Sequence, residues 1–153
     1  MFEPASENKD FLSAAAATGG RTEFPAWVRA IVVLGALLMT AGALSALVHP
    51  ALLVSPHDEI NDAVHIYAGY LAARNLVLAL MLVTAMGFRS RGTLNTLMLL
   101  AALIQVMDAA IDCVEGRWAV VPGAIVLGVL FLVAAGRLSG HPVWKTAAWR
   151  PGL

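Results

Sequence analysis

Four apolar segments dominate the sequence, and each is long enough to cross a membrane as an α-helix. They cover approximately residues 27–48, 63–86, 93–113 and 118–138. About 20 apolar residues in a helix match the thickness of a bilayer, and in lipid a helix satisfies its own backbone hydrogen bonds. Apolar residues make up 59% of the chain and charged residues 13%, which excludes an ordinary soluble domain. The sequence therefore predicts four membrane-spanning helices.

Short connections join the segments, so consecutive helices should pack antiparallel. We therefore expect an all-α fold, an integral membrane four-helix up-down bundle formed by residues 25–139. A polar N-terminal tail, residues 1–24, precedes the bundle. A cytoplasmic tail at the membrane interface, residues 140–153, follows it.

Local signals refine the helix ends and the packing. The second helix should begin near Pro56, outside the bilayer, with Ser55 as its N-cap. Glycines in the first and fourth segments, Gly35 and Gly128 among them, let helix backbones approach closely. These segments are therefore expected to pack tightly against their neighbours.

Most basic residues fall on one side of this topology. That side would hold Lys9, Arg21, Arg29, Arg89, Arg91, Arg137, Lys145 and Arg150. Arg117 falls on the opposite side, where the acidic residues Glu59 and Glu115 also lie. Cytoplasmic segments of membrane proteins are enriched in Lys and Arg. Both termini are therefore expected in the cytoplasm, in a multi-pass protein of the plasma membrane.

One arginine, Arg74, lies in the middle of the second apolar segment. A charge at the bilayer centre costs about 2.5–3.5 kcal/mol on insertion scales, so it normally faces the bundle interior and finds a partner. The third segment offers Asp108 within reach, because a helix rises about 1.5 Å per residue and an arginine side chain is long. We therefore predict an Arg74–Asp108 ion pair between the second and third helices.

Further polar side chains accompany Arg74 on the second helix. At about 100° per residue, Tyr67 and Tyr70 lie on the same stripe as Arg74. Asn75 lies about 100° round the helix, where it can bond a neighbouring helix or a second copy of the chain. Buried tyrosines more often pack with a bonded hydroxyl than take part in catalysis.

On the third helix, Gln105 and Asp112 share the stripe of Asp108. Asp108, Asp112 and Glu115, at positions i, i+4 and i+7, could hold a hard cation or form an outward-facing acidic vestibule. We favour the vestibule and predict no metal site, because zinc-type ligand spacing is absent. The Arg74–Asp108 pair itself has two interpretations: a structural clamp that sets helix register or part of a working site.

Several chemistries are excluded by what the sequence lacks. It has no phosphate-binding glycine loop and no nucleophile elbow. Cys113 is the single cysteine, which excludes a CxxC redox pair. The formal net charge is zero, so no basic field argues for nucleic acid. No cofactor motif is evident.

Three short motifs carry a resemblance to a known family. They are Ala73-Arg74-Asn75-Leu76, Arg89-Ser90-Arg91-Gly92 and Val106-Met107-Asp108-Ala109. With them, the stretch from His65 to about Leu138 resembles the DoxX-like family of small four-span bacterial membrane proteins. The resemblance implies a four-helix bundle in a bacterial inner membrane and carries over no catalytic residue. Some relatives are associated with quinone-linked redox complexes, so the resemblance makes a quinone a conceivable ligand.

We expect a small membrane protein that acts as a subunit, a scaffold or a lipophilic-ligand binder. Its partners would be the lipid bilayer and either a second copy of the chain or a larger membrane complex. The alternative is a membrane-embedded enzyme acting on a quinone or another apolar small molecule, with Arg74, Asp108 and Tyr70 as polar contacts. Ion or proton movement past Arg74 and Asp108 ranks last, because four short spans are few for a monomeric transporter.

Overall fold

The computed structural model describes residues 23–54 and 59–140. Within them, the long helices are α2 (Ala26–Val48), α3 (Asp62–Gly87), α4 (Arg91–Val114) and α5 (Val121–Ser139), with a short 3₁₀ helix, η1 (Pro50–Leu53), after α2. All four long helices are apolar and long enough to cross a membrane. The prediction of an all-α chain with four candidate spans is therefore confirmed.

The start of α3 differs from the sequence prediction. Asn61 is the N-cap, and its side-chain oxygen accepts a hydrogen bond from the backbone N–H of Val64 at 3.2 Å. Asp62 then places a negative charge in the first turn, where the helix dipole favours it. Glu59 and Ile60 precede the helix without helical structure, so a start near Pro56 is wrong. Pro56 itself and Ser55 lie outside the described residues.

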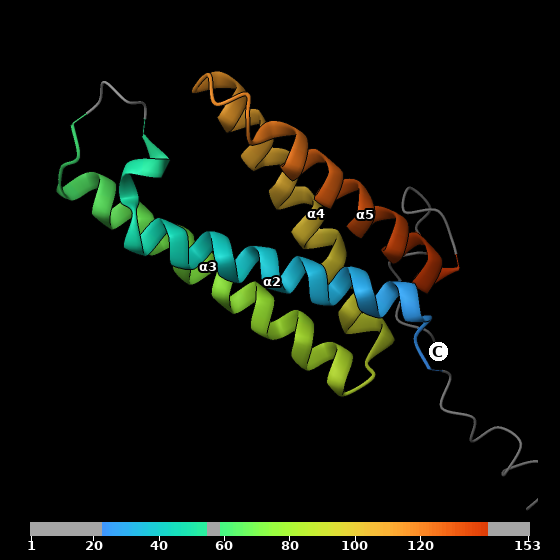
Figure 1. The fold of residues 1–153 in the computed structure, drawn as a ribbon. Coiled ribbons are helices and arrows are strands. Elements are labelled where there is room, and N and C mark those ends of the chain that lie inside the picture. Colours follow the sequence, from blue (N-terminus) through green and yellow to red (C-terminus); the bar gives the residue numbers. More distant parts are fainter. Residues whose placement is uncertain (1–22, 55–58, 141–153) are drawn as a thin grey trace, which may run out of the picture.

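The helices form two hairpins, α2 with α3 and α4 with α5, and contacts within each hairpin are far more extensive than contacts between them. Figure 1 shows the hairpins close together at the end that holds the α3–α4 turn. They lie farther apart at the opposite end, which holds η1 and the α4–α5 turn. We call these the closed end and the open end. The two hairpins therefore form a wedge, and the distance between them increases from the closed end to the open end.

Small residues explain the close packing inside the first hairpin. The buried residues of α2 and α3 include many alanines, namely Ala36, Ala43, Ala46, Ala68, Ala72 and Ala79. In lipid, helices associate through close van der Waals contact rather than through the hydrophobic effect, and small side chains allow that contact. The alanine-rich faces thus hold α2 against α3 along their length.

The large buried side chains lie toward the closed end. They come from the first halves of α2 and α4 and the second halves of α3 and α5: Val28, Val32, Leu82, Leu94, Met98 and Phe131. The ring of Phe131 fills the space above Gly35, where an added Cβ atom would overlap the ring. This contact joins α5 to α2 and fixes the two hairpins together at that end.

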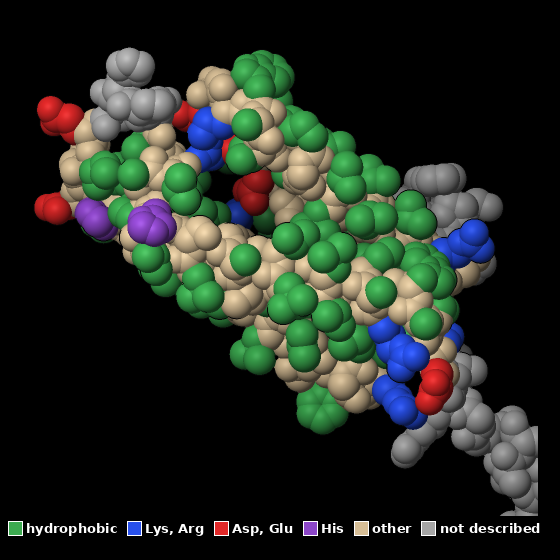
Figure 2. Space-filling model, viewed as in Figure 1, with side chains coloured by type: hydrophobic (Ala, Val, Ile, Leu, Met, Phe, Trp, Pro, Cys, Tyr) green, Lys and Arg blue, Asp and Glu red, His purple; other side chains and the backbone are tan. Residues whose placement is uncertain are grey.

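Charged side chains separate between the two ends. Arg29 lies in the first turn of α2, Arg89 and Arg91 flank the α3–α4 turn, and Arg137 lies in the last turn of α5, all at the closed end. Glu59 and Glu115 lie at the open end. The separation is not complete, because Glu23 pairs with Arg89 at the closed end and Arg117 lies at the open end. Figure 2 shows apolar side chains covering the surface between the two charged regions.

Candidate functional site

A cleft of about 540 Å³ opens between the two hairpins where they diverge. Figure 2 shows the surface hollowed there, with acidic and basic side chains inside the hollow. Most of its wall is apolar and includes Leu38 of α2, Leu71 of α3, Ile111 of α4 and Leu127 of α5. All four long helices therefore contribute to one site.

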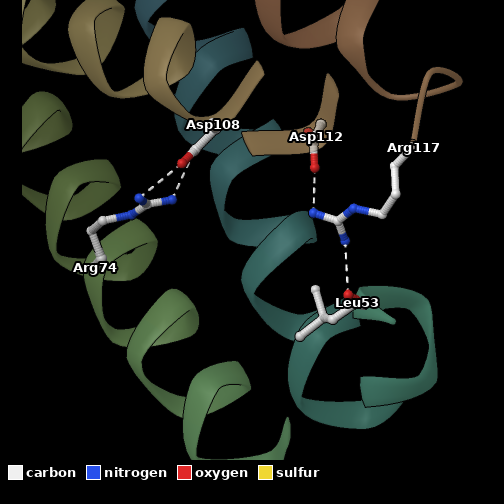
Figure 3. A network of polar contacts seen from close by, with 5 residues as sticks. All are labelled: Leu53, Arg74, Asp108, Asp112 and Arg117. Atoms are coloured by element: carbon white, nitrogen blue, oxygen red, sulfur yellow. Dashed lines mark hydrogen bonds and ion pairs between the residues drawn. The ribbon is translucent and has the colours of Figure 1, made fainter. Parts of the chain in front are cut away.

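Arg74 of α3 and Asp108 of α4 form a bidentate ion pair across this site. Arg74 Nη1 donates to Asp108 Oδ1 at 3.0 Å, and Nη2 donates to Oδ2 at 2.8 Å. Figure 3 shows the guanidinium group lying opposite the carboxylate. The predicted pairing is confirmed, and it links the first hairpin to the second. Two parallel charge-assisted bonds are the strongest arrangement that this pair can adopt.

A second polar bridge lies closer to the open end, and the local backbone of the α4–α5 turn creates it. Gly116 has a φ of +73°, a conformation that favours glycine. Its N–H bonds to the carbonyl of Cys113, and the N–H of Arg117 bonds to the carbonyl of Asp112. These two bonds form a Schellman motif, which ends α4 and turns the chain back. Arg117 is thereby held beside Asp112.

Arg117 then binds two groups with its terminal nitrogens. Nη2 donates to Oδ1 of Asp112, and Nη1 donates to the backbone carbonyl of Leu53 at 3.0 Å. Leu53 belongs to η1, on the other hairpin, so this arginine also bridges the wedge (Figure 3). Because residues 117–120 form the turn, α5 begins at Val121, later than the predicted start near Trp118.

The role of Arg117 was not predicted from the sequence, in which Arg117 is only the basic residue on the acidic side of the topology. The signal was present: Gly116 follows an apolar helix, and a Schellman turn brings the residue after the glycine back onto the residue five positions earlier. That earlier residue is Asp112, which is 8% exposed and needs a counter-charge.

The two bridges make the cleft electrically balanced. Each arginine directs both terminal nitrogens at protein oxygens, and each carboxylate faces one arginine. The Nε atoms of Arg74 and Arg117 are buried away from solvent and have no acceptor among the described residues. A ligand in the cleft therefore does not meet an unpaired charge.

Three uncharged polar side chains line the same cleft. Asn75 of α3, Gln105 of α4 and Tyr67 of α3 all contribute to its wall. Within residues 23–54 and 59–140, the two side-chain amides form no hydrogen bond, and the Tyr67 hydroxyl forms none either. An amide supplies two donors and one acceptor, and a phenol supplies one of each. The cleft thus offers neutral hydrogen-bonding groups within an apolar wall.

Tyr70 is not brought into this site. It is 75% exposed and does not line the cleft, whereas Tyr67, 47% exposed, does. The reason is rotational: the cleft side of α3 runs from Tyr67 to Asn75, and Tyr70 lies about 60° round the helix from Tyr67, on the far side of Arg74. The predicted stripe of Tyr67, Tyr70 and Arg74 does share one side of α3, but the part of that side that lines the cleft extends toward Asn75 and not toward Tyr70.

The acidic residues of α4 are separated by their partners. Asp108 binds Arg74, Asp112 binds Arg117, and Glu115 is exposed. Across the described part of the chain, no group of three or more His, Cys, Asp or Glu side chains is arranged to hold a metal ion. Cys113 is half-buried at the end of α4.

No protein-family model, curated protein or solved structure matches the chain. The cleft and its bridges therefore have to be interpreted from their own chemistry.

Proposed function

We propose that the chain is a multi-pass membrane protein that binds a small lipophilic ligand between its two helical hairpins. The observation that carries this proposal is the cleft itself: about 540 Å³, apolar on most of its wall, with a few convergent polar groups. Small-molecule sites in proteins have this size and composition, and in helical bundles they lie between helices. A ligand with an apolar body would fill the space between the diverging hairpins and make van der Waals contacts with both.

The distribution of charge supports one orientation of the molecule in the membrane. The basic residues of the closed end, such as Arg89 and Arg91, favour the cytoplasmic side, and the acidic residues of the open end favour the opposite side. In this up-down topology both termini are cytoplasmic, and the cleft opens toward the outer half of the membrane. The DoxX-like resemblance of the sequence is the support for a bacterial inner membrane as its location.

Ligand binding ranks above catalysis on a quinone or another apolar substrate. The enzyme alternative assigned polar contacts to Arg74, Asp108 and Tyr70. The first two satisfy each other with two hydrogen bonds, and Tyr70 points away from the cleft. The groups left to meet a ligand are neutral amides and a phenol, which suit binding better than proton transfer. A role as a subunit of a larger membrane complex is compatible with ligand binding.

Purification of variants tests the proposal. Ala124 of α5 lines the cleft, and Ala124→Phe would fill part of it. Val126, on the same helix, is 58% exposed and does not line the cleft, so Val126→Phe is the matched control. Mass spectrometry of organic extracts should find one lipophilic compound at a near-stoichiometric amount in the parent and the control, and not in Ala124→Phe.

Two results would contradict the proposal. One is an equal lipid content in all three proteins, with circular dichroism showing that each is folded. The other is a stoichiometric protein partner that occupies the cleft, shown by cross-links to another chain from a photoreactive amino acid introduced at position 124. The second result would support the subunit role in place of ligand binding.

A further inference from the structure

We propose that the ligand of this cleft has an uncharged polar head, a hydroxyl or carbonyl group, and that Asn75 and Gln105 bind it. This inference rests on the proposed function and adds the class of ligand. It follows from three features of the site: its charge balance, the depth of its amides and the chemistry that these amides present.

The first feature is that no charge in the cleft is available for a charged head. Both Nη groups of Arg74 are bonded to Asp108, and those of Arg117 are bonded to Asp112 and to the Leu53 carbonyl. An anionic head could gain an arginine only by displacing a carboxylate, which would leave that carboxylate without a counter-charge. Both pairs are at least partly buried, so leaving one member without its counter-charge is unfavourable. The matched pairs therefore disfavour anions and cations alike.

The second feature is depth. Asn75 lies 13 residues into α3, about 20 Å along the axis, and Gln105 lies nine residues before the end of α4, about 14 Å along the axis. In a hydrocarbon core about 30 Å thick, both amides lie near the middle. A charged head would have to lose its hydration to reach them, and desolvating a charge costs far more than desolvating a hydroxyl or carbonyl.

The third feature is the hydrogen-bonding chemistry that these two amides present beside the Arg74–Asp108 pair. Asn75 follows Arg74 on α3, and Gln105 precedes Asp108 by one turn on α4, so both lie on the closed-end side of the pair. They have no hydrogen-bond partner within the described residues. A hydroxyl or carbonyl head accepts from an amide N–H, and a hydroxyl also donates to an amide oxygen.

The apolar body of the ligand then has a defined wall. Leu38, Leu71, Ile111 and Leu127 line the cleft, one from each long helix. A chain extending from a head at the amides would contact these residues on its way to the open end or into the surrounding lipid. The polar head of the ligand would thus bind deep in the cleft, and its apolar chain would contact the apolar wall.

Competition binding with probes of one chain length tests the inference. The full-length protein is placed in phosphatidylcholine nanodiscs and loaded with radiolabelled 1-myristoylglycerol, whose head is uncharged. Unlabelled 1-myristoylglycerol, tetradecyl sulfate and tetradecyltrimethylammonium then compete for the site. We expect the uncharged competitor to displace the label at a concentration at least tenfold lower than either charged one.

Variants locate the head group. Asn75→Leu and Gln105→Leu should each weaken binding of 1-myristoylglycerol about tenfold, which corresponds to one lost hydrogen bond. Thr40→Val is the control, because the Thr40 hydroxyl bonds to its own backbone at Ala36 and lies outside the cleft. Asp108→Asn should free Arg74 and improve competition by tetradecyl sulfate at least tenfold, while competition by the cation stays unchanged.

The outcomes separate this inference from the proposed function. Label binding that Ala124→Phe retains in full would show that the cleft is not the site, and would overturn the proposed function together with the inference. Binding that Ala124→Phe abolishes, but for which tetradecyl sulfate competes as well as the uncharged lipid, would overturn the inference alone. So would binding that neither amide substitution weakens.

Discussion

Arg74 and Asp108 face each other across the wedge between the hairpins, with Nη1–Oδ1 and Nη2–Oδ2 distances of 3.0 and 2.8 Å. Their side chains are 35% and 28% exposed, and the cleft accounts for the open side of Asp108. The pair therefore has two effects: it ties α3 to α4 where contacts between the hairpins are sparse, and it removes both charges from the ligand site.

The first prediction concerns the coupling of this pair. Arg74→Leu should leave Asp108 without a partner, a loss that the carboxylate can reduce by taking up a proton. Asp108→Leu should destabilise the protein more, because arginine stays charged in proteins. The double substitution should recover an interaction energy of about 1–3 kcal/mol, measured by unfolding in detergent or lipid. Strictly additive losses would mean that the two residues do not interact.

The second prediction concerns the Arg117 bridge. Arg117→Gln removes the bond to the Leu53 carbonyl and leaves Asp112, 8% exposed, without its counter-charge. We expect a loss of about 3 kcal/mol of unfolding free energy, together with faster hydrogen exchange in η1. Adding Asp112→Asn should restore part of the stability. Arg137→Gln, at an exposed position at the closed end, is the control and should change stability little. Equal effects of Arg117→Gln and Arg137→Gln would contradict the bridge.

The third prediction concerns Gly35. Gly35→Ala places a methyl group against the Phe131 ring, so it should destabilise the protein by about 1–3 kcal/mol through overpacking. Gly42→Ala on the same helix meets no atom within 4 Å and should be neutral or slightly stabilising. Combining Gly35→Ala with Phe131→Leu should cost less than the sum of the two single changes. Thermal unfolding provides the measurement, and a harmless Gly35→Ala would show that α2 and α5 are not in contact there.

The fourth prediction concerns orientation. After replacement of Cys113 by serine, Phe88→Cys in the α3–α4 turn and Glu59→Cys at the open end each provide one exposed thiol. In intact cells an impermeant thiol reagent should label the cysteine at position 59 and leave the one at position 88 unlabelled. Disrupting the membrane should allow labelling of both. The reverse pattern in intact cells would invert the topology.

The helices and one contact between them follow from the sequence, because hydrophobic length, helix rise and the cost of an isolated charge determine them. The four helices lie close to the apolar segments, because hydrophobic length and backbone satisfaction in lipid leave few alternatives. The partner of Arg74 could also be predicted, because a buried charge needs an opposite charge at a similar depth and Asp108 meets that requirement. These inferences need only periodicity, helix rise and the cost of an isolated charge.

The angle between the hairpins was decided by tertiary packing. Phe131 against Gly35 brings the hairpins together at the closed end, whereas the open end is held by polar bridges such as Arg117 to Leu53. These contacts join residues far apart in the chain, so helical periodicity does not predict which of them form. The resulting rotation of α3 places Tyr67 and Asn75 on the cleft and Tyr70 outside it. A residue's depth in the membrane follows from its position in the sequence, but the neighbour that its side chain faces depends on how whole helices pack.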